Sequence, residues 1–419
     1  MKILWITNIV FPEVSQLLQN KLELKSSGGW MLGSAEELVK DDDIKLTVAT
    51  PTPLVNDLRY LKGAKMSYYL FPLGKGNTKY NSDYESYWKV INGELRPDVV
   101  HIHGTEFTHG LAYVKACGNK NVVVSIQGLV SVIANYYLCG LKTIDILRSI
   151  TLRDVLRGTL YHDRNEFRRK GCCEVELLKS VNHIIGRTSW DRAHVWAINP
   201  NAQYHFCNET LRPEFYSGET TWEYEKCVPH TIFLSQATYP IKGLHVVLKA
   251  MPLILRHYPD AQIRLAGRDI TRSKEGICGR IRLTGYGKII KLLIKKYNLR
   301  NKICFIGNLD AKQMIKEYLR ANVFICPSSI ENSPNSLGEA QIIGTPVVAS
   351  YSGGILDMMK GNEDNLYRYN DVEMCAHKIC QIFGTQECQC DMKNVARKRH
   401  NRRYNLETTI EIYRSLIKS

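Results

Sequence analysis

Short apolar runs alternate with amphipathic or polar segments along most of the chain. In the first half, seven of these runs have the length and composition of strands, and they cover residues 2–7, 44–50, 66–70, 98–103, 122–127, 183–186 and 204–207. Helix-like segments separate them, as in a parallel sheet whose connections cover both faces. The first half therefore predicts a doubly wound α/β domain.

The same alternation restarts in the second half. Strands are predicted at 230–235, 262–266, 302–306, 322–326 and 345–349. Polar and turn-forming residues between the halves predict a linker at 213–229. Because a chain of 419 residues is too long for one ordinary core, we expect two Rossmann-like α/β domains, at residues 1–212 and 230–399.

One loop and helix in the second half concentrate the candidate chemistry. After the apolar run that ends at Cys326, Glu331 and Glu339 follow with seven residues between them, and residues 332–336 are turn-formers or cap-formers. The N-terminus of a helix suits a phosphate, because its N–H groups are unpaired. The two glutamates could accept hydrogen bonds from sugar hydroxyls. The alternative is a capped surface helix with two solvated glutamates.

Other candidate residues lie near the ends of predicted strands. His103 ends a strand at the carboxyl edge, where open α/β sheets bind ligands, although a structural histidine is the usual outcome for such a residue. Gly28 and Gly29 precede a predicted helix and would let a ligand approach backbone N–H groups, or they form a plain loop. Lys242 ends the loop after the first strand of the second domain, where a lysine is ordinarily solvated.

Several of these residues form motifs of a known family. The spacing Glu331-x7-Glu339, followed by GTPVV at 344–348, resembles the E-x7-E block of the retaining glycosyltransferases of family four. The run PSSIENSPNSLGEA is similar to a bacterial branch that builds surface polysaccharides. DVVHIH at 98–103 and KG at 242–243 resemble two further motifs of the family. The resemblance extends over most of the chain.

This resemblance implies a fold and a set of residue roles. The fold is GT-B, in which two doubly wound Rossmann-like domains face each other across a cleft and a last helix, at about 400–419, packs back on the first domain. Glu339 would hold the ribose of a nucleotide and Glu331 the transferred sugar. We therefore expect the catalytic residues Glu331, Lys242, His103 and Gln127, and the donor-binding residues Glu339, Asn335, Ser336, Gln236, Arg268, Gly28 and Gly29.

The chain departs from the family pattern at three of these places. Pro334 has no N–H, so a donor of the common glycine-bearing version is missing. Gln236 occupies the place of an arginine, which leaves Lys242, alone or with Arg268, to neutralise the donor pyrophosphate. Gln127 stands where many members have a histidine, and glutamine can form hydrogen bonds but cannot carry a proton at neutral pH.

Charge changes the picture of the partners. The formal net charge is +15, and no helix-turn-helix, zinc-finger or RNA-stacking signature accompanies it, so an anionic membrane surface and anionic substrates explain it better than nucleic acid. Residues 129–170 mix aliphatic and aromatic side chains with bases, which suits a helix on an anionic membrane; the alternative is an ordinary amphipathic helix packed on the first domain. Residues 277–296 are strongly basic and are expected to form an exposed face. The apolar run at 2–6 predicts a first strand, because it is too short for a spanning helix and lacks a cleavage pattern.

Metal sites are not expected. Asp41-Asp42-Asp43 contains a D-x-D pattern, but it lies at the side of the sheet opposite to ligands and predicts a solvated turn. The cluster Cys375, His377, Cys380, Cys388 and Cys390 has a spacing that fits no structural zinc pattern. The thirteen cysteines, an odd number, indicate a reducing cytoplasm.

The sequence thus predicts a metal-independent retaining glycosyltransferase of hexosyltransferase type with no cofactor. It would move a sugar from a nucleotide-diphosphate sugar to a lipid-linked or growing saccharide, in capsule, exopolysaccharide or O-antigen-type synthesis, at the cytoplasmic face of a membrane. Two alternatives stay open: a nucleotide-sugar epimerase of the same architecture, and a non-catalytic basic protein that binds glycans or nucleic acid. The donor base, the sugar and the acceptor are not encoded in any motif.

Overall fold

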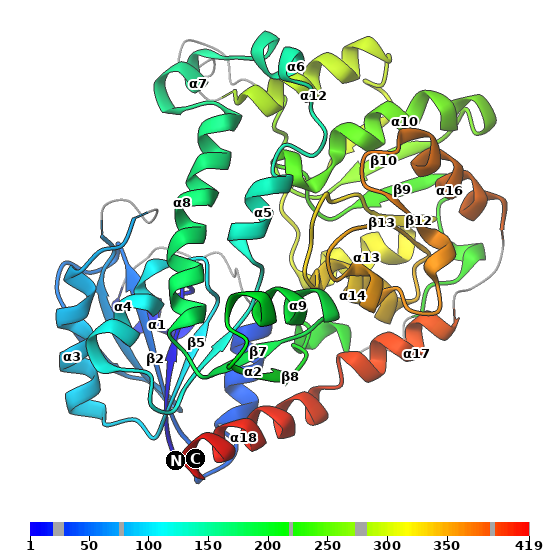
Figure 1. The fold of residues 1–419 in the computed structure, drawn as a ribbon. Coiled ribbons are helices and arrows are strands. Elements are labelled where there is room, and N and C mark those ends of the chain that lie inside the picture. Colours follow the sequence, from blue (N-terminus) through cyan, green and yellow to red (C-terminus); the bar gives the residue numbers. More distant parts are fainter. Residues whose placement is uncertain (20–28, 75–78, 218–220, 273–282, 386–389, 419) are drawn as a thin grey trace. The chain divides into compact units, whose positions relative to one another are not determined.

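Each half of the chain builds its own, mainly parallel sheet (Figure 1). The computed structural model describes residues 1–19, 29–74, 79–217, 221–272, 283–385 and 390–418. The chain forms two units: the first comprises Met1–Val132, Glu166–Pro213 and His400–Ser419, and the second comprises Ile133–Asn165 and Glu214–Arg399.

The sheet of the first unit has eight strands in the order β3-β4-β2-β1-β5-β6-β7-β8. Their bounds are β1 Lys2–Ile6, β2 Lys45–Thr52, β3 Arg59–Lys62, β4 Ser67–Pro72, β5 Val99–His103, β6 Val122–Ser125, β7 His183–Gly186 and β8 Gln203–Phe206. All neighbours pair in parallel except β3, which is antiparallel to β4. The strand order reverses between β1 and β5, so the carboxyl ends of these two strands mark the switch point of a doubly wound sheet.

Successive residues of the central strand β1 feed two separate cores. Leu4 and Ile6 pack in one apolar cluster, whereas Ile3 and Trp5 pack in another. This is the period of two that a strand imposes on its side chains. A continuous apolar run is therefore what a strand covered on both faces requires.

Helices cover both faces of the first sheet. Those that lie wholly in this unit are α1 Pro12–Leu17, α2 Gly29–Leu38, α3 Asp83–Leu95, α4 Thr108–Cys117, α9 Ser189–Ile198 and α18 Arg402–Lys418. The C-terminal helix α18 lies against α2 and β5 (Figure 1). Its fully buried Tyr413 hydroxyl accepts a hydrogen bond from Trp5 Nε1 at 2.9 Å and bonds His101 Nδ1 at 2.6 Å.

The second unit has a six-stranded, fully parallel sheet in the order β11-β10-β9-β12-β13-β14. The strands are β9 Thr231–Leu234, β10 Gln262–Leu265, β11 Ile303–Phe305, β12 Val323–Cys326, β13 Val347–Tyr351 and β14 Leu366–Arg368. The order reverses between β9 and β12. The loops that follow these two strands are therefore the expected place for a ligand.

Nine described α-helices lie wholly in the second unit. They are α6 Thr143–Arg148, α7 Leu152–Arg157, α10 Leu244–His257, α12 Gly285–Lys296, α13 Ala311–Arg320, α14 Asn335–Ile343, α15 Ile355–Met358, α16 Val372–Gly384 and α17 Cys390–Arg399. Short 3-10 turns occur at η1 Pro213–Phe215, η2 Tyr224–Lys226, η3 Pro240–Lys242 and η4 Glu363–Asn365. The chain passes from one unit to the other within α5 Val130–Tyr136 and again within α8 Leu160–Lys179.

The unit boundaries differ from the predicted ones. Ile133–Asn165 belongs to the second unit, because backbone and side-chain groups of this segment bond to it: Cys139 O, for example, accepts a hydrogen bond from His245 Nε2 at 2.8 Å. Part of the predicted linker also belongs there. Trp222 is buried, and its Nε1 donates to Ala321 O at 2.7 Å.

Two strands, β3 and β14, were not predicted. β3 is largely exposed and antiparallel, with the sequence RYLK, and β14 has only three residues. Neither presents the apolar run that marks the buried strands. Within the described parts of the chain, the search for a helix both long and apolar enough to cross a bilayer finds none.

A buried carboxylate fixes the start of α5. Glu174, fully buried on α8, accepts hydrogen bonds from the amides of Val130 and Ser131 at 3.0 and 2.9 Å. The hydroxyls of Ser131 and Thr105 donate to it at 2.6 and 2.5 Å. Burial raises the pKa of Glu174, and these hydrogen bonds oppose that rise. The carboxylate thus replaces the missing acceptors of a helix N-terminus.

We predict that Glu174→Ala destabilises the protein by about 3 kcal/mol or more, because buried donors lose their acceptor. Urea denaturation would measure the loss. The control is Glu176→Ala, since Glu176 is half-exposed and pairs with Lys115 on the surface, so its loss should cost less than about 1 kcal/mol. Equal losses for the two variants would contradict the capping role.

Candidate functional site

The loops after β9 and β12 bring together the two residues that the sequence separates by 89 positions. Lys242 Nζ and Glu331 Oε1 form a hydrogen-bonded ion pair. The side chains are only 20% and 15% exposed. Both loops leave the carboxyl edge of the second sheet at its switch point, so the pair lies where an open α/β sheet binds ligands.

Close backbone contacts hold these loops. Gly243 has φ +71°, and a Cβ there would lie 2.0 Å from Pro327 O. The amide of Ser329 donates to Ile241 O at 2.8 Å. A third loop joins at Gly353, with φ +55°, where a Cβ would lie 1.9 Å from Glu331 O. Glycine is therefore required at both positions, and the backbone itself sets the place of the ion pair.

Two opposing effects act on the pKa of Lys242. Burial alone would lower it, but the negative charge of Glu331 and the hydrogen bond to it raise it above the ordinary value. Lys242 is therefore an ammonium ion at neutral pH. It supplies a fixed positive charge at the carboxyl edge of the second sheet, where the strand order reverses.

The helix that follows carries the second glutamate. Pro334 occupies the N-cap of α14, and its side chain makes no cap hydrogen bond. Helix geometry leaves the amides of Asn335 and Ser336, in the first turn, without an intrahelical acceptor. The N-terminus of α14 thus presents a partial positive charge and free N–H donors, four residues after Glu331 in the sequence. Pro334 contributes no donor of its own, as expected.

Glu339 is 4% exposed inside α14. Its Oε2 lies 3.2 Å from the hydroxyl of Tyr318 on α13, and this hydroxyl also lies 3.0 Å from Ser336 O. Tyr318 was not among the predicted site residues, because nothing in its local sequence marks it. It bridges the first turn of α14 and the glutamate one turn later.

Two predicted donor-binding residues lie apart from this network. Gln236 is exposed, and its Nε2 donates to the hydroxyl of Tyr239 at 3.3 Å. Arg268 is also exposed and forms no ion pair with any described residue. Both follow strands at the carboxyl edge of the second sheet, after β9 and β10. Their roles toward a donor stay predictions.

The first unit contains a cavity of about 70 Å³ at the carboxyl edge of its own sheet. Gly28 lies outside the described residues, and Gly29 begins the helix α2 that walls this cavity with Trp30 and Ser34. His103 also lines it. The cavity thus lies beside β5, where the predicted role of His103 requires space for a ligand.

His103 is 6% exposed, and neither ring nitrogen has a hydrogen-bond partner among the described residues. Its ring stacks on that of His101 at 3.8 Å and meets Trp5 edge-on at 4.4 Å. Burial lowers the pKa of His103 to about 3 and that of His101 well below its ordinary value. Both imidazoles are neutral at physiological pH, so His103 can accept or donate one hydrogen bond without carrying charge.

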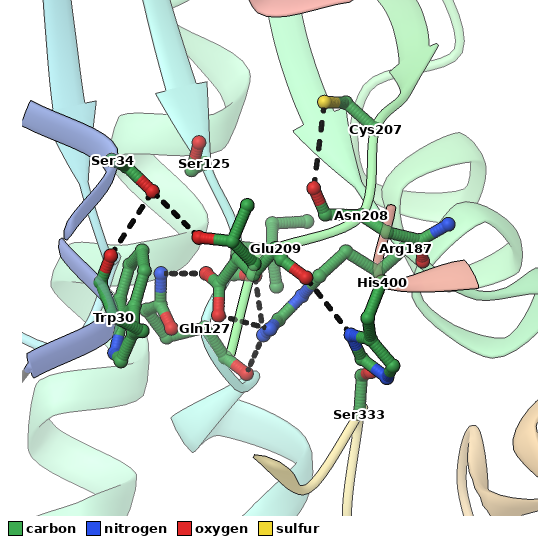
Figure 2. Close-up of polar contacts among 12 residues, drawn as sticks. Trp30, Ser34, Ser125, Gln127, Arg187, Cys207, Asn208, Glu209, Ser333 and His400 are labelled. Carbon is green, nitrogen blue, oxygen red and sulfur yellow. Dashed lines mark hydrogen bonds and ion pairs between the residues drawn. The ribbon is translucent and has the colours of Figure 1, made fainter. Parts of the chain in front are cut away.

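Glu209 organises the polar wall of the same unit (Figure 2). It accepts hydrogen bonds from Gln127 Nε2 at 2.5 Å and from Arg187 at 2.6 Å, and its backbone oxygen bonds His400 Nδ1 at 2.9 Å. Arg187 is buried and forms an ion pair with Glu209. Glu209 was missed, because it follows the last strand of this sheet in a stretch without a motif.

The structure describes part of the two candidate metal motifs. Asp41, Asp42 and Asp43 form a turn before the amino end of β2. Cys375 is buried on α16, and burial raises the pKa of its thiol to about 12. Cys388 lies outside the described residues. Among those described, no group of three histidine, cysteine or acidic side chains could hold a metal ion.

We predict that Gly243→Ala disrupts the lysine loop. It should cost about 1–3 kcal/mol more in unfolding free energy than Gly307→Ala, its matched control. Gly307 also has a positive φ, +80°, but a Cβ there would meet nothing within 4 Å. The difference between the variants therefore isolates the contact with Pro327. Equal destabilisation of both would show that this contact does not hold the loop.

The buried histidines predict an acid-sensitive fold. Below pH 6.5 the unfolded chain binds a proton at His103 that the folded protein does not, so stability falls by about 1.4 kcal/mol per pH unit for this residue as the pH drops toward its folded pKa. In His103→Gln the free energy of unfolding should fall less steeply between pH 6 and pH 4, by about 1.4 kcal/mol per pH unit. Urea denaturation across this range would test it, and unchanged slopes would contradict the assignment.

The sequence is similar to that of known glycosyltransferases. Residues 228–399 match the family described as glycosyl transferases group 1. The chain is 30% identical to the putative glycosyltransferase YtcC of Bacillus subtilis over 75% of this chain and 71% of that protein. It is 28% identical to the D-inositol 3-phosphate glycosyltransferase of Corynebacterium urealyticum over 42% of this chain, which spans only 41% of that enzyme.

Solved structures support the fold. The sucrose-phosphate synthase from Thermosynechococcus elongatus matches with a TM-score of 0.66 and 16% identity, over 100% of this chain and 99% of that chain. A glycosyltransferase from Rickettsia africae matches with a TM-score of 0.60 and 16% identity over the same shares. The predicted two-domain α/β GT-B fold is confirmed. The chain belongs to the glycosyl transferases group 1 family.

Proposed function

We propose that this glycosyltransferase moves a sugar from a nucleotide-diphosphate donor with retention of anomeric configuration. The observation that carries the proposal is the Lys242–Glu331 pair at the switch point of the second unit, followed by α14 with its uncapped first turn and buried Glu339. A cation and a helix N-terminus suit a diphosphate. Glu331 lies before the first turn of α14 and Glu339 lies within the helix. The two carboxylates therefore suit the hydroxyls of two sugars, the ribose and the transferred one.

Each group has a distinct task in this reaction. The Lys242 ammonium and the amides of Asn335 and Ser336 stabilise negative charge as it develops on the leaving diphosphate. Arg268, exposed on the neighbouring loop, adds a second cation to the diphosphate in place of the arginine that Gln236 replaces. Glu331 orients the transferred sugar, and Glu339 orients the ribose. No metal is needed, because these groups provide the positive charge.

We assign the residues of the first unit to the acceptor. The cavity beside His103 provides room, and the neutral imidazole provides a hydrogen-bond partner for a hydroxyl. Gln127 keeps its side-chain amide on Glu209, so its role is to position that wall rather than to transfer a proton. The family-four assignment and a bacterial surface-polysaccharide pathway remain our proposal for the wider context.

Net charge and the names of relatives bear on the acceptor class. We propose a lipid-linked or growing saccharide. The relative from Corynebacterium urealyticum is named for D-inositol 3-phosphate, and one from Propionibacterium freudenreichii is named a phosphatidyl-myo-inositol mannosyltransferase. A phosphorylated or lipid-bearing inositol is therefore the second acceptor class to test, and it too is anionic, which suits a chain of net charge +15.

A thermal-shift screen against UDP, GDP and ADP and their common sugar conjugates tests the donor site. We expect one nucleoside diphosphate to raise the melting temperature selectively, because a ligand that binds only the folded state stabilises it. Glu339→Ala should abolish this shift. Glu317→Ala is the matched control, since Glu317 on α13 pairs with Arg264 on β10 at 2.7 Å and has no part in the proposed site.

Variants of the two residues of the ion pair distinguish donor binding from turnover. Glu331→Gln should keep the shift with the bare diphosphate, lose the extra shift with the sugar conjugate, and lower kcat by about a hundred-fold or more. Lys242→Met should weaken the binding of the bare diphosphate and so reduce its thermal shift. Sugar transfer would be followed by release of the nucleoside diphosphate in the presence of acceptor.

Three outcomes would overturn the proposal. A folded protein that no nucleotide stabilises would favour the non-catalytic binding protein. Conversion of the donor into another sugar nucleotide, without acceptor, would identify an epimerase. Full activity of Glu331→Gln would remove the residue on which the assignment depends.

A further inference from the structure

Two short helices of the second unit expose the side chains that helices usually bury. In α7, Asp154 is buried, whereas Val155 and Leu156 are 72% and 65% exposed. An ordinary surface helix turns its apolar stripe toward the core and its polar face toward water. The polarity of α7 is therefore reversed. The helix α6 buries Ile146 but exposes Ile144 and Leu147, at 49% and 54%.

Hydrogen bonds to the rest of the unit fix this orientation. Thr151 and Asp154 form a capping box that starts α7. Asp154 Oδ1 also accepts from the amide of Gly285 at 3.1 Å, and Thr151 Oγ1 donates to Leu283 O at 2.8 Å. Lys288 Nζ donates to Ile150 O at 3.1 Å. Because Thr151 and Asp154 face the protein side, the aliphatic side chains of α7 point to solvent.

The exposed aliphatic side chains of this segment are close together in sequence, and we call the group the apolar ridge. It accounts for six of the nineteen large hydrophobic residues that are exposed in the described parts of the chain. All six lie within thirteen consecutive positions, and they are Ile144, Leu147, Ile150, Leu152, Val155 and Leu156. Exposed apolar residues scattered singly are normal, but a concentrated patch marks an interaction surface.

Basic residues accompany the ridge. The helix α12 lies beside α6 (Figure 1). Residues 142–157 and 285–296 together carry two acidic side chains, Asp145 and Asp154, and the second of these is buried. Against them stand eight basic residues: Lys142, Arg148, Arg153, Arg157, Lys288, Lys291, Lys295 and Lys296. The surface around the ridge is therefore strongly positive.

We propose that the apolar ridge docks on an anionic lipid bilayer. The aliphatic side chains would enter the boundary between headgroups and acyl chains, and the surrounding bases would bind the headgroup phosphates. Each helix has only six residues, so this is attachment to the surface of a bilayer and not passage through it. The inference concerns where the protein resides and goes beyond the proposed sugar transfer.

The chemistry of the ridge favours lipid over a protein partner. Protein interfaces are enriched in aromatic side chains and depleted in lysine. The ridge, in contrast, holds only isoleucine, leucine and valine, and five lysines and three arginines accompany it. A bilayer with anionic headgroups complements both features. The segment 129–170 forms α5, α6, α7 and the start of α8 instead of one helix, and only residues 144–156 form this surface. Of the predicted basic face, 277–282 lies outside the described residues.

Co-sedimentation of the full chain with vesicles tests the proposal. We expect binding to vesicles of phosphatidylcholine and phosphatidylglycerol in equal parts and little binding to phosphatidylcholine alone. The double variant Val155→Asp/Leu156→Asp should bind about ten-fold more weakly or worse. Val395→Asp is the matched control, since Val395 is an exposed valine on α17 of the same unit, and it should bind like the wild type.

A second variant separates the electrostatic contribution. Arg148→Glu/Arg157→Glu keeps the ridge but reverses two charges, and it should weaken binding about ten-fold at low salt. Salt screens such charges, so the difference from the wild type should shrink at high ionic strength. Both double variants change exposed side chains, and their thermal unfolding should match that of the wild type.

The outcomes are decisive for the ridge. Wild-type protein that ignores anionic vesicles, or variants that bind them as well as the wild type, would overturn the proposal. Size-exclusion chromatography without lipid gives a further check. A wild-type dimer that becomes monomeric in Val155→Asp/Leu156→Asp would assign the ridge to a second copy of the chain and would also overturn it.

Discussion

The proposed donor site depends on keeping two opposite charges close together in a poorly hydrated place. Removing Lys242 and Glu331 from water is costly, and their mutual attraction compensates only if the geometry is good. The backbone provides that geometry through the contact of Gly243 with Pro327 O and of Gly353 with Glu331 O. A bound diphosphate would compete with Glu331 for the same ammonium. In the proposed function, Glu331 holds the Lys242 ammonium in place in the free protein, and a bound donor displaces Glu331 from it.

Much of this arrangement could be predicted from sequence because it follows from topology. The apolar runs gave the central strands, and the reversal of strand order places the loops after β9 and β12 side by side. Neighbouring positions for Lys242 and Glu331 follow from that alone. The short or polar strands β3 and β14 carry too few apolar residues to be recognised without their partners.

The remaining features depend on contacts between distant positions that no local pattern encodes. Ile133–Asn165 was assigned to the wrong unit, because its attachment consists of single hydrogen bonds such as that from Gly285 to Asp154, 131 residues away. Glu209 and Tyr318 were missed for the same reason, since each acts through partners elsewhere in the chain. His103 was expected at a ligand edge, but its stacking on His101 and its depressed pKa appear only after folding.

The last helix sets an order of events during synthesis. Trp5 and His101 bond Tyr413, which is synthesised 408 and 312 residues after them. The second unit ends at Arg399, before this helix is made. The unit that begins first must therefore wait with part of one apolar face uncovered while the other completes its sheet. For most multidomain proteins the N-terminal domain matures first, and here the connectivity reverses that sequence.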